Sequence, residues 1–118
     1  MSDREKELAT PSLRALSFIL RNKELWPRDF VWDFLDCATC AMGLAWRLWA
    51  ISSPNSTAMA HAFGISQQIS TDIFVGRSLF EARGQGWLYR PGLLAVDVQP
   101  EHVAAAIDQY LAKMDLLD

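Results

Sequence analysis

The stretch CATCAMGLAWRLWAI, residues 37–51, contains only one charged residue, Arg47. A helix that is apolar on nearly every side is normally buried inside a protein. The stretch therefore predicts a helix over residues 38–50 at the centre of the core, with Asp36 or Thr39 capping its first turn. The small side chains near its start would let neighbouring helices approach closely.

Two amphipathic helices are predicted to pack against this central helix. The first covers residues 12–21, where Thr10 is placed to cap the helix and Pro11 suits its first position. The second covers residues 101–114 and follows Pro100, which suits a first helical position for the same reason. The apolar positions at helical spacing are Leu13, Leu16, Ile19 and Leu20 in the first helix, and Val103, Ile107, Tyr110, Leu111 and Met114 in the second.

Shorter elements are expected between these helices. Residues 55–63 predict a short helix that Gly64 ends, and Ser66 is placed to cap another. Residues 24–36 carry several aromatic side chains and are expected to lie over the core and insert those rings into it. Residues 87–96 surround a Pro-Gly pair that suits a type II turn, which is compatible with a short β-hairpin.

These elements together predict the fold class and the domain organisation. We expect a mainly α fold, a small single-domain bundle of five to six helices with at most one short β-hairpin. Residues 1–9 are charged and mixed in sign, which is typical of a solvated N-terminal lead-in. Residues 10–118 are expected to form one helical domain, because a chain of 118 residues fits a single domain.

The composition restricts the class of protein. Hydrophobic residues make up 51% of the chain, which is enough to build a core. The net charge of −3 argues against the broad basic surface of a nucleic-acid-binding protein. No uncharged apolar run reaches the length of a membrane span, and no signal-peptide core follows the N-terminus. We therefore expect a cytoplasmic bacterial protein that does not bind a membrane, with reduced cysteines.

Cys37 and Cys40 are the residues with the clearest chemical potential, because a helix N-terminus stabilises a thiolate. Cys40 followed by an apolar helix is similar to the Cys-Gly-Ser-Cys-Trp step of papain-like proteases. Asp36 and Cys37 followed by two small residues are similar to the Asp-Cys-Ser-Gly step of small cell-wall peptidases. Both resemblances imply a cysteine nucleophile with a histidine base, for which His61 is the candidate.

Other chemistry for the cysteines has less support. A Cys-x-x-Cys pair is also a redox dithiol, but the strand and helix that surround such a pair in thioredoxins are not predicted here. Cys37, Cys40, His61 and His102 offer four ligands for zinc, although only the two cysteines have a usual ligand spacing. Because cysteine often packs as a small buried hydrophobe, we favour a structural role and expect no metal and no cofactor.

Residues 58–69 resemble the centre of a helix-turn-helix motif. Ala60, Gly64 and the Ile65-Ser66 pair match that pattern. The resemblance implies DNA binding through the second helix, residues 67–74. That segment contains no lysine or arginine and includes Asp72, so two packed short helices are the favoured interpretation.

The order of motifs resembles a family of short uncharacterised bacterial and phage-borne proteins. The shared features are Phe30-Val-Trp32-Asp33, a Cys-x-Thr step at residues 37–39, a Cys-x-x-Gly-x-Ala step at residues 40–45, Gly64-Ile-Ser66, Ile73-Phe74, and a closing Pro-Glu-x-Val helix start at residues 100–103. The resemblance covers roughly residues 12–112. It implies the helical architecture and carries no activity.

The sequence thus favours a small non-enzymatic module for protein interaction or regulation. Its partner would be another protein or a second copy of the chain, and Trp87 and Tyr89 are the candidates for the partner surface. The first alternative is a cysteine-dependent hydrolase or thiol enzyme that uses Cys37 or Cys40. The second alternative is a helix-turn-helix DNA-binding regulator.

Overall fold

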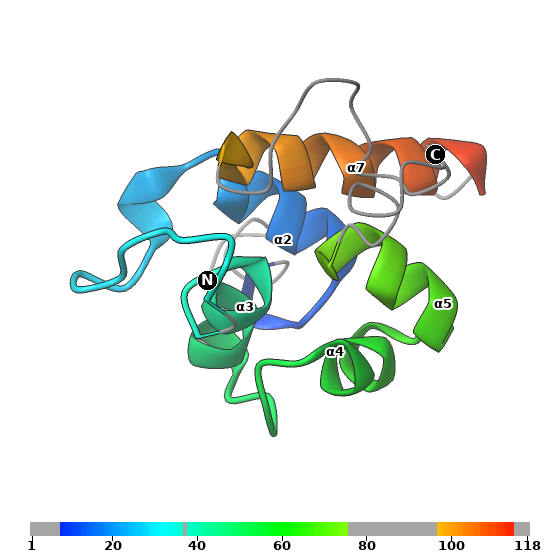
Figure 1. Cartoon of the computed structure of the whole chain (residues 1–118), viewed down its shortest axis with the longest axis horizontal. Helices are drawn as coiled ribbons and strands as arrows, with labels where there is room; N and C mark the ends of the chain where they lie inside the picture. The colour runs from blue at the N-terminus through cyan, green and yellow to red at the C-terminus, as the bar shows by residue number, and fades with distance from the viewer. Residues whose placement is uncertain (1–7, 37, 76–96, 115–118) are drawn as a thin grey trace.

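The computed structural model describes residues 8–36, 38–75 and 97–114 (Figure 1). Within these ranges the fold is all-α and contains no strand, which confirms the predicted fold class. The predicted hairpin at residues 87–96 lies outside the described residues. The elements are α2 (Leu13–Leu20), a 3-10 turn η1 (Lys23–Leu25), α3 (Ala41–Trp49), α4 (Ser56–Phe63), α5 (Gln67–Ser70), a π-helical turn η2 (Thr71–Val75) and α7 (Pro100–Lys113).

Helices α2 and α7 form the most extensive contact between described elements and lie side by side in Figure 1. Leu16 from α2 and Val103 and Ile107 from α7 have no solvent exposure. Ala104 and Ala106 are also fully buried, which allows the two helix axes to approach closely. The apolar spacing read from the sequence therefore identifies the buried faces of both helices correctly, except that Met114 is 51% exposed.

A polar cluster closes one edge of the contact between α2 and α7. The Ser17 hydroxyl is only 4% exposed and donates to Asp108 Oδ1 at 2.7 Å. Arg21 Nη1 donates to the other carboxylate oxygen of Asp108 at 2.7 Å and to Ser17 Oγ at 2.9 Å. Asp108 therefore accepts hydrogen bonds from Ser17 in α2 and from Arg21, the C-cap residue of α2, which fixes the register of the two helices.

Helix α2 starts later than the sequence predicted. Ser12, and not Thr10, is the N-cap residue, because its side chain accepts the backbone N–H of Ala15 at 3.0 Å. Pro11 therefore precedes the cap and does not occupy the first helical position. The serine satisfies one of the helix amides that would otherwise lack a partner, and this contribution decides between two capping candidates on either side of Pro11.

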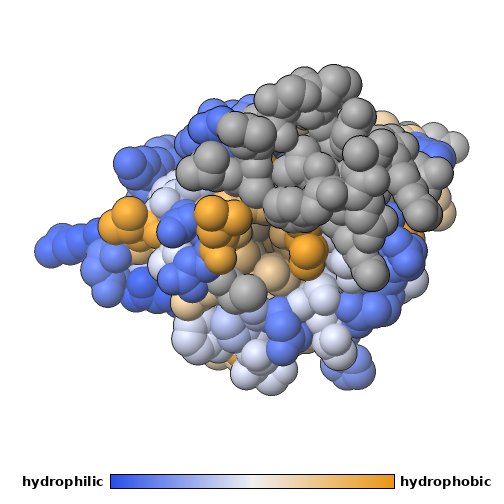
Figure 2. All heavy atoms as spheres, in the orientation of Figure 1, coloured by the Kyte–Doolittle hydropathy of each residue, from blue (hydrophilic) through white to orange (hydrophobic). Residues whose placement is uncertain are grey.

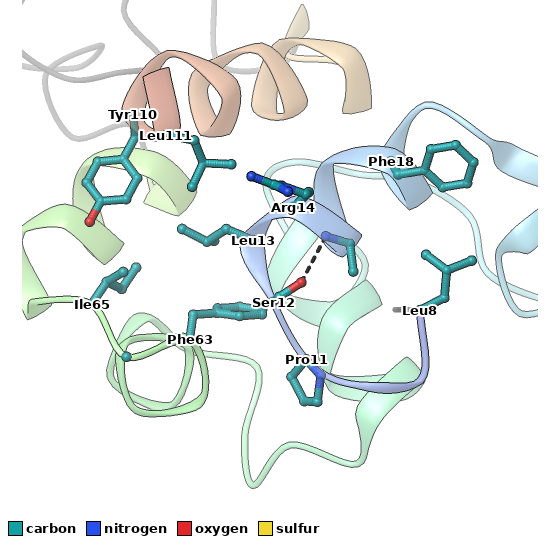
Figure 3. A pocket seen from close by; sticks show the side chains of 12 residues that line it. Leu8, Pro11, Ser12, Leu13, Arg14, Phe18, Phe63, Ile65, Tyr110 and Leu111 are labelled. Atoms are coloured by element: carbon teal, nitrogen blue, oxygen red, sulfur yellow. Dashed lines mark hydrogen bonds between the residues drawn. The ribbon is translucent and has the colours of Figure 1, made fainter. Parts of the chain in front are cut away.

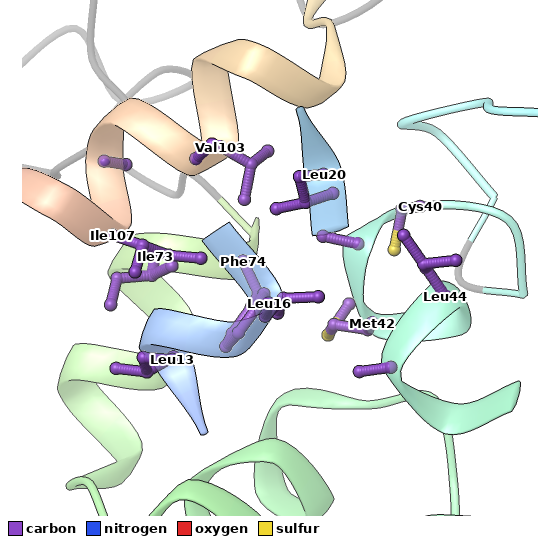
Figure 4. Packing of buried hydrophobic residues seen from close by; sticks show 14 of the residues in the cluster. Leu13, Leu16, Leu20, Cys40, Met42, Leu44, Ile73, Phe74, Val103 and Ile107 are labelled. Atoms are coloured by element: carbon purple, nitrogen blue, oxygen red, sulfur yellow. The ribbon is translucent and has the colours of Figure 1, made fainter. Parts of the chain in front are cut away.

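Helix α3 is shorter than predicted and only its first half is buried. It begins at Ala41 with Cys40 as the N-cap residue, in place of Asp36 or Thr39, and ends at Ala50 in the left-handed conformation. Residues 41–45 lie in the core (Figure 4), whereas Trp46 is 36% exposed. The α2–α7 pair, with α3 against it, is therefore the centre of the core, and the prediction of a central helix buried on all sides was wrong.

The structure confirms the predicted end of α4 at Gly64 and the predicted cap of α5 at Ser66, whereas Asn55 is the N-cap of α4 and not its first residue. Asn55 Oδ1 accepts the backbone N–H of Ala58, and Gly64 ends α4 with a φ of +67°. Ser66 Oγ accepts the backbone N–H of Ile69 and starts α5, which continues into η2. A side chain at Gly64 would meet open space, so its positive φ is what favours glycine there.

Residues 26–36 cover the core without regular secondary structure, and the structure confirms that they insert aromatic rings into it. Phe30 is buried, and Trp26 contacts its ring edge-on at a centroid distance of 5.4 Å. Val31 and Leu35 are 73% and 61% exposed. Figure 2 shows apolar side chains at the surface as separate spots in that view, not as one continuous area.

Arg47 connects this irregular segment to α3. Its Nη2 donates to Asp29 Oδ1 at 2.8 Å. The hydrogen bond from Arg47 holds the pKa of the Asp29 carboxyl below its usual value. Because the Asp29 side chain is 79% exposed, solvent screens this ion pair strongly.

The polar cluster gives a stability prediction. Replacing Asp108 with alanine removes an acceptor from both Ser17 and Arg21, and leaves the Ala104 carbonyl at 3.4 Å as the acceptor for the Ser17 hydroxyl. We expect Asp108→Ala to lower the free energy of unfolding in urea by about 1–2 kcal/mol. Arg21→Ala keeps the bond between Ser17 and Asp108 and should cost less than about 1 kcal/mol.

Asp29→Ala is the matched control, because it also removes an aspartate that pairs with an arginine, but at an exposed site. We expect no resolvable change in stability for this variant. Equal losses for Asp108→Ala and Asp29→Ala would show that the buried hydroxyl contributes nothing.

Candidate functional site

Cys40, the central residue of the predicted cysteine site, is 2% exposed and belongs to the core cluster. Figure 4 shows its sulfur among apolar side chains, including Leu20. His61, the proposed base, is exposed on α4. Cys37 lies outside the described residues. A nucleophilic thiol must be reached by its substrate, and the burial of Cys40 does not provide that access.

The second histidine has a structural partner. His102 Nδ1 accepts the backbone N–H of Gln99 at 2.9 Å and completes a capping box at the start of α7. Among the residues that the structure describes, no group of three or more His, Cys, Asp or Glu side chains is arranged to hold a metal ion. Trp87 and Tyr89, the predicted partner surface, lie outside these residues.

Helices α4 and α5 have the order of a helix-turn-helix, with a short turn at residues 64–66. The polar side chains of α5 form hydrogen bonds with nearby residues of the same chain. Gln67 Nε2 donates to Ser56 Oγ at 2.8 Å, and Gln68 Nε2 donates to Asp72 Oδ1 at 3.0 Å. Positions 67–75 contain no lysine or arginine, so this segment offers no cationic side chain for phosphate contacts.

A candidate site among the described residues is an apolar groove with a volume of about 650 Å³. It lies where the first turns of α2 meet the turn after α4 and the last turns of α7 (Figure 3). We refer to it as the α2/α7 groove. Its main apolar lining residues are Leu8, Leu13, Phe18, Phe63, Ile65 and Leu111.

The polar groups of the α2/α7 groove are few. Ser12 lies at one side, where its hydroxyl already caps α2, and Tyr110 lines the side that α7 provides. Arg14 is the only charged residue among those that line the groove. An apolar cavity with a small number of polar groups is typical of a binding site.

Trp49 contacts two residues that line the α2/α7 groove, Leu8 and Phe63, without lining the groove itself. Its indole Nε1 donates to the backbone carbonyl of Leu8 at 2.9 Å. Its ring contacts Phe63 edge-on at a centroid distance of 6.0 Å. Phe63 in turn stacks on the buried Phe74 at 5.9 Å. One tryptophan on α3 therefore positions lining residues that come from two other segments.

Sequence reasoning did not find this groove. Its lining residues come from positions 8–18, 63–65 and 110–111, which no sequence motif joins. Most of these residues belong to segments that the sequence marks as apolar, but Leu8 falls in the predicted solvated lead-in, residues 1–9. An apolar stripe also does not indicate whether its end packs against a neighbour or remains open. The signal that was available is the cluster of large apolar residues at helix ends, such as Phe63 and Ile65 beside Gly64.

Comparison of the chain with protein-family models, with characterised proteins and with solved structures finds no match. The resemblances noted from the motifs therefore stay predictions. Of the described helices, none is both long enough and apolar enough to span a membrane.

The role of Trp49 gives a testable prediction. Trp49→Phe keeps an aromatic ring beside Phe63 but loses the hydrogen bond to the Leu8 carbonyl. We expect this variant to lower the free energy of unfolding by about 1–2 kcal/mol. Trp46→Phe is the control at an exposed tryptophan of the same helix and should change it by less than about 0.5 kcal/mol. Similar changes in the free energy of unfolding for both variants would show that Trp49 does not stabilise the groove residues.

The burial of Cys40 gives a second prediction. A Cys37→Ser variant leaves Cys40 as the only cysteine. We expect iodoacetamide to leave this thiol unlabelled in the folded protein at pH 6, and labelling to begin only as urea unfolds the chain. Rapid labelling of the folded protein at pH 6 would contradict this expectation and would favour the cysteine-dependent enzyme.

Proposed function

We propose that this protein is a protein-interaction module whose α2/α7 groove receives a helical segment of a partner protein. The observation that carries the proposal is the groove itself, an apolar cavity of about 650 Å³ with one charged group. Its size lies within the range of about 300–1,000 Å³ that is common for binding pockets. Apolar side chains that line a groove in the free protein become fully buried when a partner covers them.

The partial burial of the lining residues supports the interpretation of the groove as a binding site, and not as a region of the core that is packed incompletely. Phe18, Phe63 and Ile65 are only partly buried, so a partner side chain placed between them would remove further apolar area from water. Phe63 is held by ring contacts with Trp49 and Phe74, which keeps one wall in place before a partner arrives. A preformed wall lowers the entropic cost of association.

A helix is the partner conformation that this surface favours. One common mode of binding for extended peptides adds a strand to a sheet edge, and the described ranges contain no strand to extend. An amphipathic helix instead inserts apolar residues at i, i+3 or i+4, and i+7 into an apolar groove. The burial of Cys40 argues against the first alternative, a thiol enzyme. The lack of lysine and arginine in α5 and η2 argues against the second alternative, a DNA-binding regulator.

The proposal is tested by selection from a display library of helical peptides with apolar residues fixed at i, i+4 and i+7 and flanking positions that vary among Glu, Gln and Lys. We expect peptides that bind the wild-type chain with micromolar affinity and bind Ile65→Asp at least tenfold more weakly, because the carboxylate would lie in the apolar groove. Val31→Asp is the matched control, since Val31 is 73% exposed and does not line the groove.

Unfolding in urea establishes that each variant is folded, and Ile65→Gln replaces Ile65→Asp if the aspartate prevents folding. A selection that yields no peptide able to distinguish the wild-type chain from the Ile65 variant would refute the proposed function. If Val31→Asp weakens peptide binding as much as Ile65→Asp does, the peptides bind outside the groove, which would also refute the proposal.

A further inference from the structure

We propose that the helical segment bound by the α2/α7 groove is acidic, with a carboxylate that pairs with Arg14 beside the apolar anchor. This inference rests on the proposed function and identifies the chemistry of the partner. It follows from the charge of the groove and from the position of Arg14 on α2.

The charge of the groove is opposite to that of the whole chain. The sequence has 14 acidic and 11 basic residues and a net charge of −3. Among the described residues that line the groove none is acidic, and one, Arg14, is basic. A partner residue that enters this groove therefore meets a positive charge within a protein that is negative overall.

The position of Arg14 strengthens this local positive charge. Arg14 lies in the first turn of α2, and that turn contains no acidic residue. The N-terminal end of a helix carries a partial positive charge, which adds to that of a guanidinium located there. The two contributions act in the same direction and favour an anionic group over a cationic one.

The geometry of Arg14 suits a carboxylate at the side of an apolar anchor. Figure 3 shows its side chain extended toward Leu111, next to the apolar lining of the groove. Arg14 already takes part in an interaction within the chain. A guanidinium has five N–H donors in a planar arrangement, so it is able to bind a partner carboxylate in addition to that contact.

The partner helix must then carry its acidic residue on the same face as its anchor. Residues three or four positions apart share one face of a helix, so a Glu at i−4, i−3, i+3 or i+4 from the anchor is placed to reach Arg14. A Lys at that position would put two positive charges together. This repulsion would let the groove discriminate between acidic and basic amphipathic helices.

The experiment measures binding of the peptides selected above, in versions with Glu, Gln or Lys at the enriched flanking position. We expect the Glu peptide to bind the wild-type chain about five- to tenfold more tightly than the Gln peptide. Arg14→Gln should abolish this preference and leave affinity for the Gln peptide unchanged. Arg14→Glu should reverse it in favour of the Lys peptide, and Arg14→Lys should retain most of it.

Arg28→Gln is the matched control, because Arg28 is exposed and does not line the groove, and it should leave the preference for Glu intact. Equal binding of the three peptides to the wild-type chain, with binding still lost in the Ile65 variant, would overturn the acidic partner while the proposed function stands. A preference for the Lys peptide would also overturn it. If no peptide distinguishes the Ile65 variant, the proposed function itself fails.

Discussion

Helices α2 and α7 are separated by most of the chain, and the face on which they meet combines a dry apolar contact with one polar cluster. Leu16, Val103 and Ile107 exclude water from the contact. Ser17 and Arg21 both bond to Asp108 and thereby select one register among the several that an apolar face would permit. The position of α3, of the α4–α5 unit and of the irregular segment before α3 is defined relative to this pair.

Tryptophan side chains attach the irregular parts of the chain to that pair. Trp26 donates its indole N–H to the Ile19 carbonyl at the end of α2, and Trp32 donates to the Val98 carbonyl just before α7. Trp49 does the same for Leu8 ahead of α2. Each indole buries apolar surface and also donates to a backbone carbonyl in another part of the chain. This dual use explains how three of the five tryptophans join separate segments of the described part of the chain.

The α2/α7 groove follows from this arrangement. The first turn of α2 and the last turns of α7 lie together because the two helices are packed in a fixed register, and the turn after α4 reaches them from the other side. Three converging helix ends carry apolar side chains, yet they leave an open groove of about 650 Å³. Arg14 is the one charged residue among the described residues that line the groove. The same packing that leaves the groove open therefore also places a positive charge beside it. Recognition of an acidic amphipathic helix is the function that this combination supports.

Much of the local structure could be predicted from the sequence, because it depends on residues close together in the chain. The ends of α4, the cap at Ser66 and the buried faces of α2 and α7 follow from capping chemistry and helical spacing. Local patterns do not separate capping candidates that lie close together in the chain. For this reason the sequence did not identify Ser12 and Cys40 as the N-cap residues of α2 and α3. The candidate site could not be predicted beyond the apolar character of its segments.

The tertiary structure alone decided which apolar surfaces became core and which remained open. Residues 41–45 of α3 are buried while Trp46 is exposed, although both lie in the same apolar run. Likewise, Phe63 and Ile65 look like core residues in the sequence, yet they line a groove. The sequence by itself determined where helices form and which of their faces are apolar, since those properties depend on neighbours along the chain. Burial depends on which distant segment covers a face, and that is fixed only when α2 and α7 pack together.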